Sequence, residues 1–363
     1  MRILIAGAGP AGLYLAYLLG RARPGWRIRI VEQNARDSTF GFGVVFSDRA
    51  LEFLRADDAQ TYALVTPQME NWTDLTVVHR GEPVVIDGIG FAAIGRLRLL
   101  QLLQSQVERV SLPVEFERPL KSKGEIEDYD LVVAADGANS FVRSTADFGT
   151  TVEPLTNKFA WFGTTRPFGT LTQTFVRNEH GTFNAHHYRH SPQMSTFVVE
   201  CDAATWRRAG FADMAEKDTL AFCQDVFKET LQGHALVSNR SIWRNFPKVR
   251  NERWSVGNKV LVGDAQRTAH FSIGSGTRLA MEDAILLSKV LLEGKPLSAF
   301  EAERRPIVEK LVAAADASGA WYERFAEHMQ LSPREFAWSY IQRSGRVDPD
   351  RLRKTSPRFV DGH

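Results

Sequence analysis

The sequence has few cysteines, no long uninterrupted apolar run and no excess of charge of either sign. Cys201 and Cys223 are the only two cysteines in 363 residues, which excludes a disulfide framework or a four-thiolate zinc site and predicts a reducing, cytoplasmic location. Lysine and arginine total 45 against 43 acidic residues, a net charge of +2, so neither a nucleic-acid nor a membrane-surface partner is predicted. The composition indicates a soluble, intracellular globular protein with a substantial core.

The apolar stretch near the N-terminus predicts neither a membrane span nor a secretory signal. It runs from Ile3 to Leu19 but contains three glycines and a proline, so it lacks the roughly 20 consecutive apolar residues of a spanning helix. Residues 2–6 instead predict a strand buried on both faces, residues 13–19 a buried helix and residues 27–32 a second strand. This β-α-β order predicts an α/β protein with a parallel sheet.

Two later segments predict further strands of that sheet. Residues 129–136 and 258–264 are apolar runs that each end in aspartate, and the second precedes a glycine-rich turn and a helix over residues 277–292. The intervening residues 157–201 are rich in aromatic, β-branched and threonine side chains, which indicates several antiparallel strands. A helix predicted over residues 215–231 is expected to lie on them.

The glycine turn after the first strand predicts a dinucleotide site. Its glycines allow a tight turn and close approach of a diphosphate to the helix N-terminus, and a carboxylate twenty residues further on, at the end of the second strand, is placed to bind the adenosine ribose. That carboxylate repels a 2′-phosphate, so FAD or NAD is favoured over NADP; a glycine turn without a ligand is the alternative. The residues assigned to this end of the dinucleotide are Gly7, Gly9, Pro10, Ala11, Gly12, Glu32 and Gln33.

Three further segments resemble motifs of the aromatic flavoprotein monooxygenases, the class that contains para-hydroxybenzoate hydroxylase. Asp264 with the later Gly274-Ser275-Gly276-Thr277 resembles the second FAD motif, Asp136-Gly137 resembles the Asp-Gly motif, and Arg96 resembles the arginine that reaches the FAD diphosphate. The resemblance implies bound FAD, with NADH or NADPH as a transient reductant. A helix N-terminus near Thr277 is expected to favour negative charge on the reduced flavin.

The resemblance also implies two interleaved domains, which agrees with a length above the roughly 250–300 residues of a single core. The expected fold is a Rossmann-like FAD-binding domain interleaved with an antiparallel-sheet substrate domain, followed by C-terminal helices. The predicted boundaries are 1–75, 92–150 and 250–295 for the FAD-binding domain, 76–91 and 151–249 for the substrate domain, and 296–363 for a helical segment and a basic tail, with one long helix from Pro296 to about Met329.

A narrower resemblance concerns the substrate. The segments 40–48, 161–165, 185–189, 270–277 and 343–346 are similar to the flavin module of salicylyl-CoA 5-hydroxylase and anthraniloyl-CoA monooxygenase, and more distantly to the tryptophan-derivative hydroxylase of violacein biosynthesis. This implies ring hydroxylation of an aryl-CoA thioester, such as salicylyl-CoA to gentisyl-CoA, with O₂ through a flavin hydroperoxide. The alternatives are a free aromatic acid or an indole intermediate as substrate, a flavin-dependent C=C reductase, or a non-catalytic flavin-binding protein.

Strand alternation nominates the residues around the ring to be hydroxylated. His186 and Tyr188 are expected on one face of a strand and His187 on the other, while only one of Trp161 and Phe162 can face the substrate. His186 is predicted to hydrogen-bond a ring hydroxyl or amine; a histidine satisfied within the sheet is the alternative. We therefore predict catalytic roles for His186, His270 and Phe271, substrate contacts from Trp161, His186, Tyr188 and Phe271, flavin contacts from Phe42, Gly43 and Val44, and no metal site.

The basic tail leaves two interpretations open. Arg343, Arg346, Arg351, Arg353 and Lys354 are placed to hold the phosphates of CoA or belong to a solvated, partly disordered terminus. The sequence ends where many aryl-CoA relatives continue into a second, reductase-like flavin domain, which favours simple hydroxylation. A homodimer is a further expectation.

Overall fold

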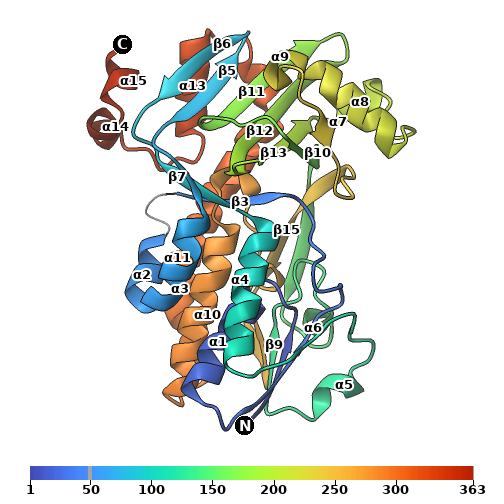
Figure 1. The fold of residues 1–363 in the computed structure, drawn as a ribbon, viewed down its shortest axis with the longest axis vertical. Coiled ribbons are helices and arrows are strands. Elements are labelled where there is room, and N and C mark those ends of the chain that lie inside the picture. Colours follow the sequence, from blue (N-terminus) through green and yellow to red (C-terminus); the bar gives the residue numbers. More distant parts are fainter. Residues whose placement is uncertain (48–50, 363) are drawn as a thin grey trace.

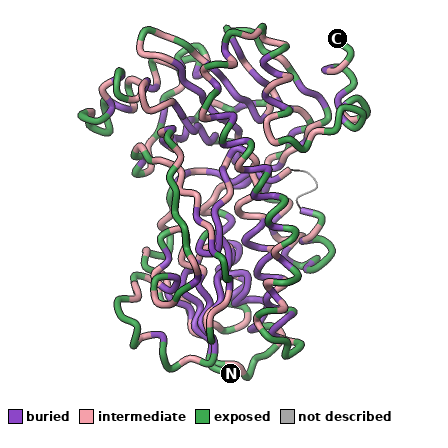
Figure 2. The backbone as a smooth tube through the Cα atoms, turned by 180° about the vertical axis from the view of Figure 1, so that it is seen from behind, coloured by how far each residue is buried: buried purple, intermediate pink, exposed green. Residues whose placement is uncertain are grey.

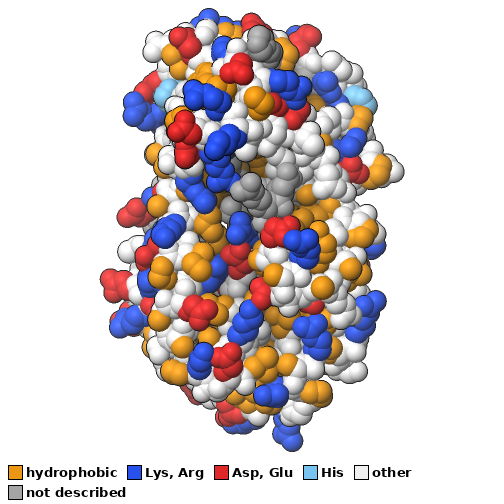
Figure 3. All heavy atoms as spheres, turned by 90° about the vertical axis from the view of Figure 1, so that its left-hand side faces the viewer, with side chains coloured by type: hydrophobic (Ala, Val, Ile, Leu, Met, Phe, Trp, Pro, Cys, Tyr) orange, Lys and Arg blue, Asp and Glu red, His pale blue; other side chains and the backbone are white. Residues whose placement is uncertain are grey.

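The computed structural model describes residues 1–47 and 51–362. Asp48, the last residue of the segment 40–48, and His363, the last residue of the basic tail, lie outside the described residues. The molecule is elongated, with one sheet in the lower lobe and the largest sheet in the upper lobe (Figure 1). On the face shown in Figure 3, basic and acidic side chains are interspersed over both lobes. Within the described ranges, no helix is both long and apolar enough to cross a membrane.

The lower lobe is built on a six-stranded sheet in the order β16-β17-β9-β1-β2-β8. All neighbouring pairs are parallel except β16 with β17, which confirms the predicted parallel sheet. Helices α1 (Pro10–Ala22), α4 (Arg96–Arg109) and α10 (Gly276–Leu292) pack together beside it around the largest apolar cluster. Its strands are β1 (Arg2–Ala6), β2 (Arg27–Val31), β8 (Val114–Glu115), β9 (Leu131–Ala134), β16 (Ser255–Val256) and β17 (Lys259–Leu261), and the short helices α5 (Gly124–Glu127) and α6 (Phe141–Ser144) follow β8 and β9.

The upper lobe holds an eight-stranded sheet in the order β14-β10-β13-β12-β11-β5-β6, with β15 paired to β10 off this path. The strands predicted within residues 157–201 form its antiparallel centre, and only β11 with β5 is a parallel pair in the described sheet. The strands are β5 (Leu75–His79), β6 (Glu82–Ile86), β10 (Thr150–Thr164), β11 (Leu171–Asn178), β12 (Gly181–Ser191), β13 (Met194–Cys201), β14 (Leu236–Val237) and β15 (Arg244–Asn251).

Helices cover the two faces of this sheet unevenly. The helix predicted over residues 215–231 is interrupted at Phe227, whose buried ring packs into the cluster beneath it. One face carries α7 (Ala203–Arg208), α8 (Glu216–Val226) and α9 (Lys228–Leu231), and the other carries the C-terminal helices.

A small third sheet, which the sequence did not predict, lies between the lobes (Figure 1). It consists of β3 (Gly43–Ser47), β7 (Phe91–Gly95) and β4 (Glu70–Trp72), joined antiparallel. The segment between β3 and β4 contains α2 (Glu52–Asp57), α3 (Ala59–Val65) and the 3-10 turn η2 (Thr66–Gln68). Because β3 lies between the lobes, residues 43–47 can contact both.

The C-terminal helices tie the lobes together. The long helix α11 (Leu297–Glu323) ends six residues before the predicted Met329 and is followed by the short α12 (Phe325–His328), and α13 (Pro333–Gln342) packs on β5 and β6. The tail is folded as α14 (Pro349–Thr355) and α15 (Pro357–Asp361), and it has buried as well as exposed positions (Figure 2). Leu352 and Phe359 are buried there. The interpretation of this segment as a partly disordered terminus is therefore wrong for its described residues.

Candidate active site

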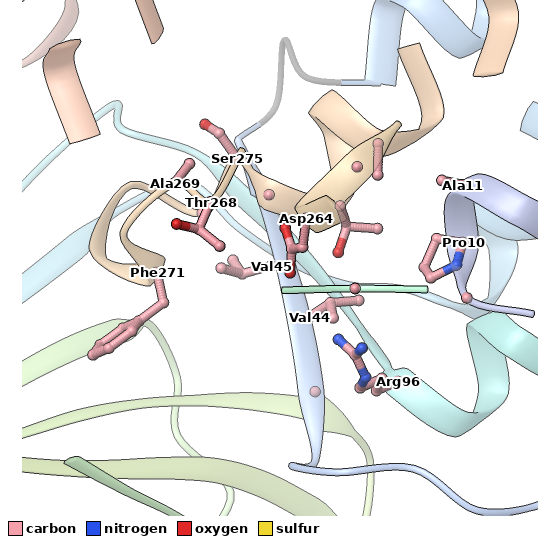
Figure 4. A pocket seen from close by; sticks show the side chains of 18 of the residues that line it. Pro10, Ala11, Val44, Val45, Arg96, Asp264, Thr268, Ala269, Phe271 and Ser275 are labelled. Carbon is pink, nitrogen blue, oxygen red and sulfur yellow. The ribbon is translucent and has the colours of Figure 1, made fainter. Parts of the chain in front are cut away.

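A cavity of ≈ 270 Å³ lies where the three sheets meet (Figure 4). Its lower wall comes from the first turns of α1 and α10 and the start of α4, and its upper wall from the inner face of β10, β12 and β13. The strand β3 contributes Gly43, Val44 and Val45 between these walls. The cavity is therefore bounded by segments from positions 9 to 280 of the chain.

The first glycine turn brings the N-terminus of α1 to this cavity. Gly7 has a left-handed φ of 101°, and a Cβ on it would lie 2.2 Å from the carbonyl oxygen of Ala135. A Cβ on Gly12 would lie 2.0 Å from the carbonyl oxygen of Gly7, so neither position accepts a side chain. Gly7 and Gly12 shape the turn from behind, while Gly9, Pro10 and Ala11 line the cavity. No side chain caps the first N–H groups of α1, which suits a diphosphate.

Glu32 supports the same turn. Its carboxylate accepts hydrogen bonds from the Ala8 N–H at 2.8 Å and from the backbone and side-chain amides of Asn34 at 2.9 and 2.7 Å. Neither Glu32 nor the exposed Gln33 lines the cavity. A ribose contact from either residue stays a prediction, and the contacts present show a carboxylate that fixes the backbone in front of α1.

The second turn, η3 (Gly263–Ala265), is held by a buried ion cluster. Asp283 is fully buried, accepts the Gly263 N–H at 3.0 Å, and pairs with Arg267 at 2.7 Å and Arg304 at 2.8 Å. This network turns Asp264 toward the cavity, where its side chain is exposed and its carboxylate faces the charges of Arg267 and Arg96. Asp264 is thereby placed as an acceptor for hydroxyl groups of a bound molecule.

The residues before α10 form the facing side of the cavity. Gly274 adopts a left-handed φ of 60° after the turn η4 (Phe271–Ile273), and Ser275, Gly276 and Thr277 lead directly into the helix. All four residues line the cavity, as the second motif predicts. The positive end of the helix dipole therefore points at the cavity, where it favours negative charge.

Arg96 is the first residue of α4, and its guanidinium points into the cavity beside Val44 (Figure 4). Its Nε donates to the Thr39 hydroxyl at 3.1 Å, which fixes its direction. Burial lowers its pKa while Asp264 opposes the shift. Arg96 contacts no carboxylate directly among the described residues, so its charge is available to a diphosphate.

Besides Gly7, Gly12, Glu32 and Gln33, two further residues predicted to contact the cofactor lie outside the cavity lining. Asp136 caps α6 by accepting the Val142 N–H at 3.1 Å, and burial raises its pKa; the next residue, Gly137, lines the cavity instead. Phe42 packs its ring directly on Gly163 of β10, where a Cβ would approach the ring to 2.5 Å. The flavin-facing position predicted for Phe42 is thus occupied by its neighbours Gly43 and Val44.

The upper wall of the cavity is aromatic. Trp161, Val198 and His186 are register neighbours across β10, β13 and β12, so their side chains share one face of the sheet. All three line the cavity, whereas Phe162 is buried on the opposite face, as strand alternation requires. Tyr188 also lines it, but its hydroxyl donates to the Gly43 carbonyl at 2.9 Å and so ties the sheet to β3.

The two nominated histidines differ in position. His186 lines the cavity, its Nε2 has no hydrogen-bond partner among the described residues, and burial together with the charge of Arg343 lowers its pKa to about 3. His270 lies behind Phe271, stacked on its ring at 4.3 Å, with Nδ1 at 2.7 Å from the Ser272 hydroxyl. Burial and Arg343 lower the pKa of His270 to about 3 as well. Both imidazoles are neutral near pH 7, and only His186 reaches the cavity.

Several lining residues escaped prediction. Phe159 and Phe246 close the aromatic wall, with ring centroids 5.0 and 6.1 Å from that of Phe271. Phe159 lies two residues before Trp161, so the alternation that nominated Trp161 also identifies it. Phe246 comes from β15, and no local motif links that strand to the cavity.

The residues that line the cavity suit FAD. Two uncapped helix N-termini and Arg96 suit a diphosphate, Asp264 suits sugar-chain hydroxyls, and glycine at positions 9 and 276 leaves open space where a Cβ would project. Two helix N-termini that suit a dinucleotide lie next to a wall of aromatic side chains. This arrangement is typical of a flavoprotein that acts on aromatic rings.

The model of the family described as FAD binding domain matches residues 1–122 and 123–315, and the chain belongs to that family. Salicyloyl-CoA 5-hydroxylase of a Streptomyces species is 40% identical over 361 residues, which are 95% of this chain and 70% of that protein. Protodeoxyviolaceinate monooxygenase of Chromobacterium violaceum is 37% identical over 368 residues, 96% of each chain. The structure of tetrameric 2-methyl-3-hydroxypyridine-5-carboxylic acid oxygenase aligns with a TM-score of 0.71 at 18% identity, over 96% of this chain and 97% of that one.

These comparisons confirm the family resemblance, the expected fold and FAD as the cofactor. The protein is an FAD-dependent aromatic monooxygenase.

Proposed function

We propose that the protein hydroxylates the ring of an aryl-CoA thioester, such as salicylyl-CoA or anthraniloyl-CoA, using NADH or NADPH and O₂. The proposal rests on the charge of the substrate side of the cavity. Among the described lining residues Arg96 is the single cation, and it lies at the diphosphate side near Asp264. The aromatic wall offers only neutral groups, because the pKa of His186 is lowered to about 3.

A neutral wall selects against a free aromatic acid. An ionised carboxylate that leaves water without a cationic partner loses several kcal/mol of solvation, and Asp264 adds a repulsive charge when it is ionised. A thioester carbonyl carries no charge and needs only a hydrogen-bond donor. The cavity therefore favours the acyl group in its esterified form, as in the name of the salicyloyl-CoA relative.

A second surface cavity supports CoA as the esterifying group. It has a volume of ≈ 270 Å³, is lined by Arg346 and Arg351, and reaches Ser47 at the far end of β3, whose near end lines the main cavity. These two arginines, with Asp348 as the single acidic residue of the described lining, suit the phosphates of CoA. Of the other basic tail residues, Arg343 points inward and donates to the Ser272 carbonyl at 2.9 Å, and Arg353 pairs with Asp350.

When bound, FAD supplies the redox chemistry that joins hydride from NAD(P)H to O₂ activation and ring oxygenation. The protein orients the ring: Phe159, Phe246 and Phe271 hold its faces and exclude water from the reaction space. His186 presents its free Nε2 to a ring hydroxyl or amine, as acceptor or donor according to its tautomer. Tyr188 keeps β3 fixed against the substrate sheet through its bond to Gly43.

An indole-derived substrate is the second candidate. The same neutral aromatic wall suits an uncharged indole ring, and one relative is a protodeoxyviolaceinate monooxygenase. The surface cavity with Arg346 and Arg351 has no role with such a substrate, which is why the CoA thioester is preferred.

The test compares substrates that differ in one feature each. We expect NAD(P)H oxidation coupled to O₂ uptake and hydroxylated product with salicylyl-CoA, a smaller kcat/KM with its N-acetylcysteamine thioester, and almost none with salicylate. Replacing Arg346 and Arg351 by alanine is expected to raise KM for the CoA ester only, because the truncated thioester has no phosphates. Turnover of free acids alone, or of indoles alone, contradicts the aryl-CoA assignment, and flavin reduction without oxygenated product contradicts hydroxylation.

A further inference from the structure

A third cavity lies on the opposite face of the eight-stranded sheet. Its volume is ≈ 980 Å³, at the upper end of the roughly 300–1,000 Å³ typical of small-molecule sites. His186 and His187 are successive residues of β12, so His186 faces the active-site cavity and His187 this one. The walls are the β5–β6 hairpin, the loop 166–170, the outer side of β11 and the end of α9.

This cavity is cationic. Arg80, Arg166 and Arg177 line it, against Glu229 as the single acidic residue of the described lining, and Glu229 is exposed. Arg80 and Arg177 donate to backbone carbonyls at 2.8 and 3.3 Å, and none of the three arginines pairs with a carboxylate in the described part of the chain. Their charges are thus oriented but not neutralised.

Arg166 lies beside an aromatic ring in the lining of this cavity. Its guanidinium lies over the Phe168 ring, 5.0 Å from the centroid, in the loop between β10 and β11. Burial lowers its pKa, so the charged form gains from an anionic neighbour. An aromatic ring beside an arginine suits a ligand with a flat or apolar body and an anionic group.

His187 provides a separate indication of a ligand. It is 1% exposed, its Nε2 bonds the Thr174 hydroxyl at 2.9 Å, and its Nδ1 has no partner among the described residues. A buried polar atom without a partner is unfavourable, and because His187 lines the cavity beside Phe168, a ligand that hydrogen-bonds this atom would remove that cost. Next to it, the hydroxyl groups of Thr76, Thr170 and Thr172 form a connected row with spacings of 2.8 and 3.0 Å.

We propose that this cavity is a second binding site, for a small organic anion with a carboxylate or phosphate group on a planar or apolar body. The arginines bind the anion, the threonine row and His187 hydrogen-bond its polar atoms, and Phe168 contacts its body. The site goes beyond the hydroxylation itself, which uses only the opposite face of the sheet. Two sources share this chemistry, an aryl carboxylate and a nucleoside phosphate.

Calorimetric titration of the FAD-loaded protein with salicylate and, separately, with adenosine 3′,5′-bisphosphate tests the proposal. Saturable binding of at least one is expected. The double variant Arg166→Gln with Arg177→Gln should raise its dissociation constant by roughly tenfold or more, through loss of charge-assisted hydrogen bonds. Arg207→Gln, at an exposed arginine of α7, is the matched control and should bind as the parent protein does.

A second variant distinguishes loss of the binding site from misfolding of the double variant. The lining residue Gly169 is exposed and has open space where its Cβ would project, so Gly169→Trp places a bulky neutral side chain at the rim of the cavity and should also weaken binding. Flavin content of each variant confirms folding. Failure of both ligands to bind overturns the proposal, and so does binding that survives both changes, since the ligand then lies elsewhere. Adenosine 3′,5′-bisphosphate is also part of CoA, so both titrations use a background in which Arg346 and Arg351 are replaced by alanine, which keeps this test separate from the aryl-CoA assignment.

Discussion

Glu200 is a carboxyl group buried in the substrate sheet without a cationic partner among the described residues. It lies on β13, is 2% exposed, and accepts one hydrogen bond, from the Asn157 amide at 2.9 Å. Its second oxygen has no partner in the described chain. Burial raises its pKa from 4.5 to about 8; the Asn157 hydrogen bond opposes the shift and the charge of Glu323 adds to it. Glu200 is therefore a neutral acid at pH 7.

The sign of the resulting pH dependence follows from the two pKa values. The folded protein keeps this proton up to about pH 8, whereas the unfolded chain releases it near 4.5, so its contribution to stability is complete below 4.5 and is lost as the pH rises to 8. Each pH unit in that window costs about 1.36 kcal/mol of unfolding free energy. The interval of 8 − 4.5 = 3.5 units corresponds to about 5 kcal/mol in total.

Glu200→Gln removes the titration while preserving shape. We expect the unfolding free energy of the variant, relative to the parent, to rise by about 4 kcal/mol between about pH 5 and about pH 8. Urea unfolding at several pH values and one fixed FAD concentration measures this, since bound FAD itself stabilises the protein. Asp213→Asn, which removes an exposed carboxylate, is the control and should show a small, nearly constant difference. Parallel pH curves for parent and Glu200→Gln refute the reasoning.

Three further outcomes are expected. Gly12→Ala should abolish FAD retention, because its Cβ would lie 2.0 Å from the Gly7 carbonyl oxygen. Flavin absorbance after gel filtration measures this retention. Gly25→Ala is the control and should retain FAD, because its Cβ would project into open space. Arg96→Ala should weaken FAD binding by roughly 10- to 100-fold in fluorescence titration, since a charge-assisted hydrogen bond contributes about 1.5–3 kcal/mol; unchanged affinity contradicts its diphosphate role. His186 and His270, with pKa values lowered to about 3, should add no inflection to the pH profile of kcat/KM near 6.5, and their share of stability should fall as the pH drops from 6.5 toward 3.

The cofactor side was predictable because its chemistry is local. A glycine whose Cβ would collide with backbone, or a carboxylate at a strand end, can be recognised from the few residues around it. Eleven of the predicted cofactor positions line the cavity. Phe42 shows the limit of this reasoning. Flanking glycines allow close approach on either side, and the ring lies on Gly163 instead of facing the cavity.

The substrate side was only partly predictable, since strand alternation gives the face of a residue but not the neighbours of that face. It placed Trp161 and His186 on the face of the sheet that lines the cavity, while their contacts with substrate stay a prediction. Phe246 is brought to the same wall by the pairing of β15 with β10, which has no local signal. The small sheet of β3, β7 and β4 escaped for the same reason, because short strands far apart in sequence form it. A ligand-binding role for His187 could not be predicted from the sequence, because the cavity that it lines is formed by the surrounding loops.

The strand order of the lower sheet has a consequence for biosynthesis. β1 pairs with β9 through Ile3 and Leu131, and β9 pairs with β17 through Val132 and Lys259, so the first strand made gains its complete sheet only after residue 261 has been synthesised. At roughly 5–20 residues per second, the chain needs on the order of 10–50 s to cover that distance. During this time the free edge passes from β1, until β9 has been made, to β9, until β17 has been made, and such unpaired parallel edges are prone to aggregation. The cofactor cavity also needs Gly276 and Thr277 at the start of α10, so it can form only after that part of the chain has been made.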